Sequence, residues 1–379
     1  RTRNHRTSTG AYTPTLTAAP DELIGIAEGV GAAGTGVLQV VSDFHDVDDE
    51  FATLRAMVDR SGRPMSISVA RNPLQPDAFR AILDHITAAN DDGLSMTGQV
   101  APRAVGLILG LECTLNPFMT NPVYRTVADR PLPARVAALR DPDTRRRLLE
   151  AAAERSRERL GQSLVARFDL LFEMDAEPDY EPAPSDSIAA RAERQRITPE
   201  ELALDTMLAD GGHGLLYLPF LNYVDGSLDG CHEMLTHPHT VPGLGDGGAH
   251  VGTICDGSFP TTLLQYWGRD RARGRIDLPF LVQRHCRDTA RTVGLLDRGI
   301  VAPGHRADLN VVDFDNLRLH KPVIVHDLPA GGRRFLQRAD GWEHTIVAGQ
   351  ETYRAGEATG ALPGRLVRGA QAEPEEEPA

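Results

Sequence analysis

The sequence predicts an α/β protein in which parallel βα units are followed by a small β domain. Over the first two-thirds of the chain, short β-rich runs alternate with longer helical patterns. Strands and helices at this spacing indicate βα units built around a parallel sheet. From about residue 299 the chain changes to short strand patterns separated by Gly, Pro and Asp turns. That change predicts a separate β domain after the βα units.

The strand segments are short, apolar and rich in β-branched residues, which is typical of strands buried on both faces. The helical segments between them carry recognisable start signals. In one of them, Thr198 is the expected cap, Pro199 the first helical residue and Glu201 the capping-box partner. We expect parallel strands at residues 37–42, 65–70, 94–100, 167–172, 214–221 and 240–245.

One stretch, residues 103–130, interrupts this alternation with Gly, Pro and Asn scattered among apolar residues. A long insertion in the position of a βα connection is usually a functional loop or lid. The helix that begins near Asp141 carries charges of both signs, which is typical of a solvated helix face. The sequence therefore predicts an irregular loop followed by a surface helix.

Composition argues against several classes of function. The 379-residue chain is 41% hydrophobic and 25% charged, close to the average of globular domains. Its net charge of −13 argues against a nucleic-acid partner, and no apolar run is long enough for a membrane-spanning helix. The four cysteines form no CxxC pair, so neither a zinc knuckle nor a redox dithiol is indicated. A reduced, cytoplasmic protein is the default expectation.

The strongest local signal for chemistry is the glycine-rich segment GLGDGGAHVGTICDGSFPT at residues 243–261. Asp246 stands where a predicted buried strand ends and a glycine pair begins. The carboxyl ends of the strands form the catalytic face of a parallel barrel, so a carboxylate there is well placed for proton transfer or metal binding. His250, four residues further on, could assist it. A helix-capping Asp followed by a turn-forming glycine pair explains the same spacing equally well.

Four further residues are candidates for the same face. Asp43 and Arg71 end the first two predicted strands, and Asp43 could act there as a ligand or a base. Arg71 could bind a substrate carboxylate through two parallel N–H donors. Asn4 and His5 precede the first strand and could line the same mouth. Each of the four residue types, taken alone at such a position, more often has a structural role.

Two other features are interpreted as structural. His237 and His239 form the only HxH of the chain, but they follow a helix and precede a strand, at the wrong end of a barrel for a metal site. Pro238 between them prevents ordinary strand pairing, so a surface loop is expected. Cys255 lies in the loop after Asp246, where a small buried thiol is favoured over a nucleophile.

Several segments together resemble the amidohydrolase superfamily, and within it the N-acyl-D-amino-acid deacylase (D-aminoacylase) branch. The pattern GxxAPGxxADLNVVD is specific to the superfamily and marks where the chain leaves the barrel for a small β-sandwich. The resemblance covers nearly the whole chain and is strongest over residues 197–368. It is carried by GLGDGGAHVGTICDGSFPT, LLQYWGRDR, GLLDRGIVAPGHRADLNVVDFDNL, HDLPAGGRRFLQRADGWEHTIVAGQ and TGALPGRLVRG.

This resemblance implies a (β/α)₈ TIM-type barrel with a small C-terminal β-sandwich domain. Residues 1–298 are assigned to the barrel, 299–368 to the sandwich, and 369–379 to a disordered acidic tail. The chain resembles an N-terminally truncated member of the branch, so the barrel is expected to be incomplete. The C-terminal strands at residues 308–313, 323–327 and 343–348 are expected to pack as one sheet beside the barrel, not inside it. Part of the apolar face of this sheet is expected to be uncovered.

The resemblance also implies metal-assisted hydrolysis of an amide at the carboxyl face of the barrel. In such enzymes a metal-activated water attacks the acyl carbonyl, and an Asp at the end of the last strand passes the proton to the leaving nitrogen. Asp246 matches that Asp and is expected to open into the largest cleft at the strand ends. The expected cofactor is a divalent metal, zinc, with its principal ligands upstream of Arg1 and with Asp43 and His250 as candidates within the chain.

The chain departs from its better-characterised relatives at two mid-barrel strand ends. Those relatives carry histidine ligands there, whereas here the ends read VVSDF and SVARN. The favoured function is deacylation of an N-acyl-D-amino acid, a small-molecule substrate. The alternatives are hydrolysis of another amide or cyclic amide on the same barrel, or a non-catalytic binding protein that has lost its metal ligands. No nucleic-acid or membrane partner is expected, and the oligomeric state is left open.

Overall fold

A parallel sheet lies at the centre of the protein. The computed structural model describes residues 5, 7, 11–157, 164–243, 245 and 247–375. Within this part of the chain, four parallel strands form one open sheet in the order β1-β2-β3-β7. Four of the six predicted parallel strands are thereby confirmed. They are β1 (Leu38–Val40), β2 (Met65–Val69), β3 (Met96–Val100) and β7 (Thr240–Pro242).

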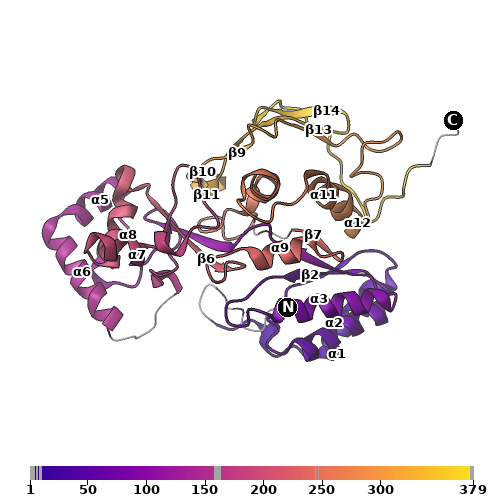
Figure 1. The fold of residues 1–379 in the computed structure, drawn as a ribbon, viewed down its shortest axis with the longest axis horizontal. Helices are drawn as coiled ribbons and strands as arrows, with labels where there is room; N and C mark the ends of the chain where they lie inside the picture. Colours follow the sequence, from indigo (N-terminus) through magenta and orange to yellow (C-terminus); the bar gives the residue numbers. More distant parts are fainter. Residues whose placement is uncertain are drawn as a thin grey trace.

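The helices next to this sheet bury one apolar face each. In α2, the buried side chains Phe51, Leu54 and Val58 recur at helical spacing. This helix begins where the Asp46 carboxylate accepts a hydrogen bond from the Asp49 N–H, as an N-cap does. Figure 1 shows α1, α2 and α3 together on one side of β2. The helices adjoining the sheet are α1 (Pro20–Ala32), α2 (Val47–Ser61), α3 (Ala78–Asp91) and α9 (Asp229–Thr236).

Two of the predicted barrel strands belong to a different sheet. Segments 167–172 and 214–221 were expected to be parallel to the others, but the strands there pair antiparallel in the order β4-β6-β5. The region 103–130, predicted to be irregular, supplies the third strand. A parallel crossover needs a dozen or more residues, and the turn after β3 is too short for one. The strands are β4 (Val105–Gly110), β5 (Phe172–Glu173) and β6 (Leu215–Leu221).

The antiparallel sheet carries a helical insertion with its own apolar core. Leu109, Phe118, Leu139, Leu148 and Leu204 belong to this core and are almost fully buried. The insertion extends to one end of the molecule, away from α1–α3 (Figure 1). One of the two hydrogen bonds of the capping box predicted at the start of α8 is present, because the Glu201 N–H donates to the Thr198 hydroxyl. The helices are α4 (Pro122–Arg125), α5 (Leu132–Arg140), α6 (Pro142–Arg157), α7 (Ile188–Gln195) and α8 (Pro199–Leu208).

After β7 the chain forms short helices and then the C-terminal β domain. The main sheet of this domain has the order β15-β14-β13-β8, and two pairs, β10-β11 and β9-β12, stand apart from it. Segments 308–313 and 343–348, predicted to share a sheet, do so, whereas 323–327 pairs elsewhere. The helical segments are α10 (Phe259–Thr262), the π-helical Leu263–Asp270, α11 (Leu278–Gln283), the π-helical Arg284–Asp288 and α12 (Thr289–Thr292). The strands are β8 (Leu309–Val312), β9 (Arg318–Leu319), β10 (Val323–Leu328), β11 (Gly332–Leu336), β12 (Ala339–Asp340), β13 (Trp342–Val347), β14 (Gln350–Arg354) and β15 (Glu357–Ala358).

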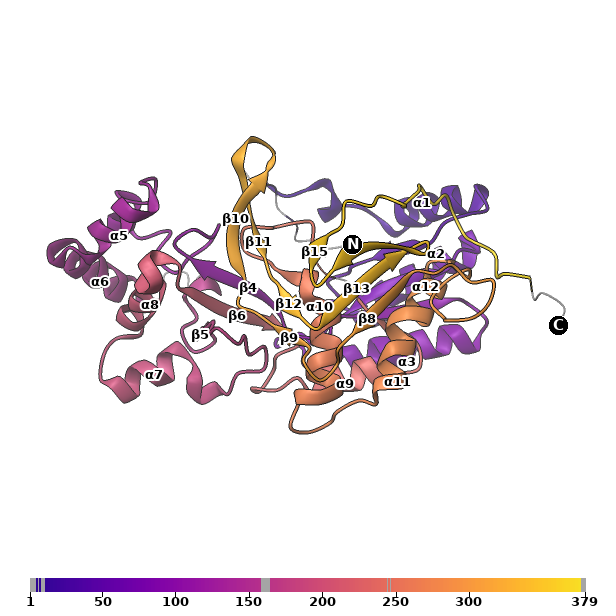
Figure 2. The ribbon, with the colours of Figure 1, turned by 90° about the horizontal axis from the view of Figure 1, so that it is seen from above.

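The β domain leaves part of its apolar face open, as the sequence predicts. A cavity of about 1500 Å³ separates this face from the helices that follow β7. Its walls include Leu264 and Leu278 on the helical side and Val312, Trp342 and Tyr353 on the sheet. Figure 2 shows β8 and β13 lying side by side over this region.

The start of the acidic tail is ordered, contrary to the prediction of disorder from residue 369 onward. Gln371 forms a parallel bridge with Leu295, and the Gln371 N–H donates to the carbonyl of Gly294. Low hydrophobicity predicts disorder for a segment without partners, whereas here backbone groups of the loop after α12 pair with the tail. Among the described residues, no helix is long and apolar enough to cross a membrane.

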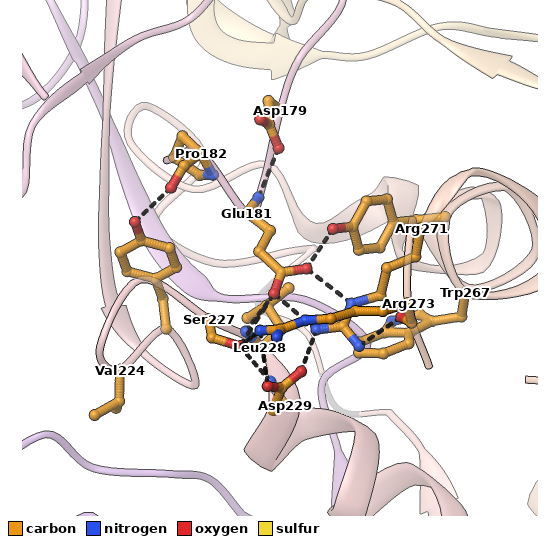
Figure 3. A network of polar contacts seen from close by, with 12 residues as sticks. Asp179, Glu181, Pro182, Val224, Ser227, Leu228, Asp229, Trp267, Arg271 and Arg273 are labelled. Atoms are coloured by element: carbon orange, nitrogen blue, oxygen red, sulfur yellow. Dashed lines mark hydrogen bonds and ion pairs between the residues drawn. The ribbon is translucent and has the colours of Figure 1, made fainter. Parts of the chain in front are cut away.

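A buried ion pair joins the connector between β5 and α7 to Arg271, which follows the π-helical segment Leu263–Asp270 (Figure 3). The guanidinium of Arg271 donates to both carboxylate oxygens of Glu181, at 2.8 and 2.9 Å. Its side chain is 3% exposed and that of Glu181 is 11% exposed. Arg271 also lies over the Trp267 ring, and the indole N–H of Trp267 donates to the Pro102 carbonyl just after β3. Through Trp267, the network therefore contacts the segment that follows β3.

The stability supplied by Glu181 should be lost in acid. Burial acts to raise the pKa of Glu181, but hydrogen bonds from Arg271, the Leu228 N–H and Tyr266 outweigh it and lower the pKa. A group with a lowered folded-state pKa stabilises the fold above its unfolded pKa, about 4.3, and this stabilisation disappears as the pH falls through the folded-state value. We expect the difference in unfolding free energy between wild type and Glu181→Gln, from urea titrations, to be largest near neutral pH and to shrink below about pH 4. A difference that is constant across this range would contradict the assignment.

Candidate active site

The carboxyl ends of the four parallel strands bring the candidate residues to one edge of the sheet. Asp43 follows β1 and Arg71 follows β2, so the two lie on neighbouring strands. The segment that leads to Asp246 follows β7, where the Gly243 N–H donates to the Val100 carbonyl at 2.9 Å. Asp246 and Asn4 lie outside the described residues. The predicted gathering of strand ends is therefore confirmed for β1, β2, β3 and β7.

A buried glutamate holds the loop that carries Asp43. The Glu50 carboxylate accepts hydrogen bonds from the Ser42 hydroxyl and from the N–H groups of Phe44 and His45. Phe44 has a positive φ of 48°, a conformation that costs a non-glycine residue about 1–3 kcal/mol. The surrounding contacts must offset this strain, so the loop after β1 has a defined shape.

The Arg71 head group is held largely by protein atoms. Its Nε donates to the Pro76 carbonyl at 3.2 Å and its Nη1 to the Val224 carbonyl at 3.4 Å. Its remaining partner is the carboxylate of Asp225, at 3.6 Å. The Asp225 side chain is 86% exposed, so this last contact is the one that a ligand carboxylate would most easily replace.

Asn222 ties the antiparallel sheet to this edge. It follows β6, is fully buried, and has a positive φ of 68°. Its side-chain oxygen accepts from the Arg71 N–H at 2.9 Å, and its amide nitrogen donates to the Arg103 carbonyl at 3.2 Å. One side chain thus links the ends of β2 and β3, which places the insertion directly beside the candidate site.

A buried arginine lies between β3 and the glycine-rich segment. Arg103 and Asp256 are 3% and 7% exposed, and their charged groups approach to 3.6 Å. Arg103 also donates to the Cys255 carbonyl at 2.6 Å and to the Ser258 hydroxyl at 2.9 Å. Burial acts to lower the pKa of Arg103, but its neighbours, Asp256 among them, outweigh this and raise the pKa above its usual value. The guanidinium is therefore a fixed positive charge under the loop.

The glycine-rich segment itself lies between the insertion and the C-terminal domain. The Ile108 N–H of β4 donates to the Thr253 carbonyl at 2.7 Å, and the Phe335 N–H of β11 donates to the Val251 carbonyl at 2.8 Å. His250 is exposed, has a φ of 51°, and accepts two backbone hydrogen bonds at its carbonyl. The loop after Asp246 is therefore held by β4, by β11 and by hydrogen bonds within the loop itself.

The described residues do not fit a complete metal centre. Among them, no three His, Cys, Asp or Glu side chains converge so as to hold a metal ion. Asp43 is half-buried after β1, and His250 is exposed in the glycine-rich segment. Neither belongs to a group of three possible metal ligands among the described residues. His5 is exposed, and its carbonyl accepts from the Thr13 N–H.

The cavity of about 1500 Å³ lies away from the strand ends. It lies between the C-terminal sheet and the helices after β7, and neither Asp43 nor Arg71 lines it. The expectation that Asp246 opens into the largest cleft stays a prediction, because Asp246 lies outside the described residues.

The features interpreted as structural do not take part in the candidate site. His237 ends α9 and precedes β7, so the HxH is at the opposite edge of the sheet, as predicted. Burial raises the pKa of the Cys255 thiol to about 11. This thiol stays protonated at neutral pH, which makes it a poor nucleophile.

Sequence analysis did not identify three residues that shape this edge of the sheet, namely Glu50, Arg103 and Asn222. Glu50 could have been found, because it shares the apolar face of its helix with Leu54 and Val58, and a carboxylate there needs partners. Arg103 lies in the stretch interpreted as an irregular loop. Asn222 carries no signal of its own, since its partners are more than a hundred residues away in sequence.

A model described as the amidohydrolase family matches residues 1–353 of the chain. The chain belongs to the amidohydrolase family. No curated protein sequence was found to match this amidohydrolase. The resemblance drawn from its glycine-rich and C-terminal segments is thereby confirmed for the family.

Three solved D-aminoacylase structures have a fold similar to that of this amidohydrolase, each at 16% sequence identity. One is a mutant in complex with CuCl₂, with a TM-score of 0.53. The second, with a TM-score of 0.52, is described by its binuclear metal centre, and the third, at 0.50, as a novel subset of amidohydrolases. The matches cover 94%, 92% and 92% of this chain but only 60%, 59% and 59% of those chains. The likeness supports a barrel with a C-terminal sheet domain.

Proposed function

We propose that this amidohydrolase cleaves a carbon–nitrogen bond other than a peptide bond, in an N-acyl amino acid or a similar amide. The observation that carries the proposal is the family match over residues 1–353. The edge formed by β1, β2, β3 and β7 supports it, because active sites of parallel barrels lie at the carboxyl ends of their strands.

In the proposed reaction, Asp246 acts first as a base and then as an acid. It takes a proton from water as the water oxygen attacks the acyl carbonyl carbon. It then gives this proton to the nitrogen as the carbon–nitrogen bond breaks, which leaves a carboxylic acid and an amine. The acid loses its remaining proton to solvent and becomes a carboxylate. A positioned side chain of this kind typically contributes about 10²–10⁴-fold to a rate.

Arg71 is the proposed partner of the substrate carboxylate, and Asn4 and His5 are further candidates near the same mouth. The contact of Arg71 with the exposed Asp225 at 3.6 Å supports this role, because a substrate carboxylate can take the same place. We further propose that the deacylated substrate is an N-acyl-D-amino acid, as in the enzymes whose fold is similar.

Assays with defined substrates test the proposal. N-acetyl-D-amino acids should release acetate. The L enantiomers should release acetate more slowly or not at all. A cyclic amide is assayed in parallel to test the alternative hydrolase. Zinc content is measured on the same preparation. Zinc at a near-stoichiometric level together with acetate release supports a metal-dependent hydrolase. Absence of release from every amide would reject the proposed function.

One observation favours a second candidate, a non-catalytic binding protein. The described residues lack a group of three metal ligands, as expected if the ligands of the family were lost. Such a protein would bind N-acyl amino acids without turnover and without bound zinc. Calorimetric binding together with unchanged substrate would identify it.

A further inference from the structure

We propose that Arg103 is a positioning residue, which orders the described residues that flank Asp246, namely Gly245 and residues 247–258. This inference rests on the proposed function of Asp246. The starting observation is that the loop after Asp246 returns to the end of β3, where the Arg103 guanidinium donates to the Cys255 carbonyl and the Ser258 hydroxyl. Arg103 therefore connects the loop to a central strand.

A continuous set of contacts leads from Arg103 to the residue before Asp246. A Cβ placed on Gly245 would lie 2.8 Å from the Asp256 Cβ and 3.1 Å from the Phe259 ring. Arg103 contacts both of these neighbours, pairing with the Asp256 carboxylate at 3.6 Å and lying 4.9 Å from the centre of the Phe259 ring. Gly245 is thus packed onto two residues whose places depend on Arg103.

The geometry of the pocket favours positioning over substrate binding. The guanidinium also lies 3.8 Å from the centre of the Tyr180 ring, and the Arg103 side chain is 3% exposed. Its donors therefore point at protein atoms and not at the open edge of the sheet. Lys cannot replace Arg103, because its ammonium is a compact point charge that cannot both stack on a ring and donate through a planar fork.

Arg103→Lys is the test variant, and Arg271→Lys is its matched control. Arg271 is equally buried, at 3% exposure, and also combines an ion pair with an aromatic contact, but its hydrogen bonds go to Glu181, Asp229 and Arg273. Both variants should lose stability. Below their unfolding temperatures, Arg103→Lys should lower kcat about 10- to 100-fold with little change in KM, as a small misplacement of a reacting group does. The kcat of Arg271→Lys should stay close to that of wild type.

Amide hydrogen exchange provides a readout that needs no activity. In Arg103→Lys, exchange should accelerate across residues 247–255, where Thr253 and Ile254 donate to the His250 carbonyl. In Arg271→Lys it should not. Equal losses of kcat in the two variants, or unchanged exchange across the loop in Arg103→Lys, would overturn the proposal. If wild type hydrolyses no amide, the proposed function fails by itself, and the exchange comparison still decides whether Arg103 orders the loop.

Discussion

Asp246→Asn should lower kcat by about 10²–10⁴-fold and leave KM and stability nearly unchanged. The substitution keeps the shape of the side chain but removes the group that accepts and returns the proton. The alternative role, a cap for the following helix, predicts an unchanged kcat, because Asn is as good a helix cap as Asp. The two interpretations of the same residue are therefore separated by one variant.

The measurement is steady-state hydrolysis of the N-acetyl-D-amino acid that wild type cleaves fastest. Asp315→Asn is the matched control, since it makes the same chemical change at an exposed position of the C-terminal domain. Thermal unfolding of both variants shows whether the fold is retained. Wild-type turnover by Asp246→Asn would remove Asp246 from the proposed mechanism.

Arg271→Met should lower the free energy of unfolding by about 3–5 kcal/mol, which is the usual effect of removing one partner of a buried ion pair. Methionine fills most of the space over Trp267, so loss of volume is a minor part of the change. The main effect is that Glu181, 11% exposed, keeps a buried charge without its guanidinium partner. Asp229, which pairs with the same guanidinium, is half exposed and can be solvated instead.

Arg273→Met is the matched control for this prediction. Arg273 pairs with Asp229 at 2.9 Å, but its side chain is 71% exposed, and an exposed pair contributes only about 0–1 kcal/mol. Urea unfolding of the two single variants should differ accordingly. In the double variant Glu181→Gln with Arg271→Met, the loss should be smaller than the sum of the two single losses, because no unpaired charge is left. Additive losses would show that the two residues do not act as a pair.

Local patterns were sufficient to predict the elements that depend on near neighbours in sequence. Apolar runs located β1, β2, β3 and β7, and the cap at Thr198 located the start of α8. The edge that carries Asp43 and Arg71 followed from strand order alone, because the carboxyl ends of parallel strands meet on one side. These features depend on periodicity and on bonds within a few residues, which a single sequence displays.

The remaining features depend on contacts between distant segments. The apolar run that became β6 is equally compatible with either strand direction, and only its pairing with β4 made it antiparallel. Arg103 was placed in an irregular loop by its sequence, and it became a buried anchor because Cys255 and Ser258 fold back over it. The sequence by itself thus determined which segments form strands and which candidate residues end them. Tertiary structure decided strand direction and which polar side chains are buried, because these depend on partners that lie far away along the chain.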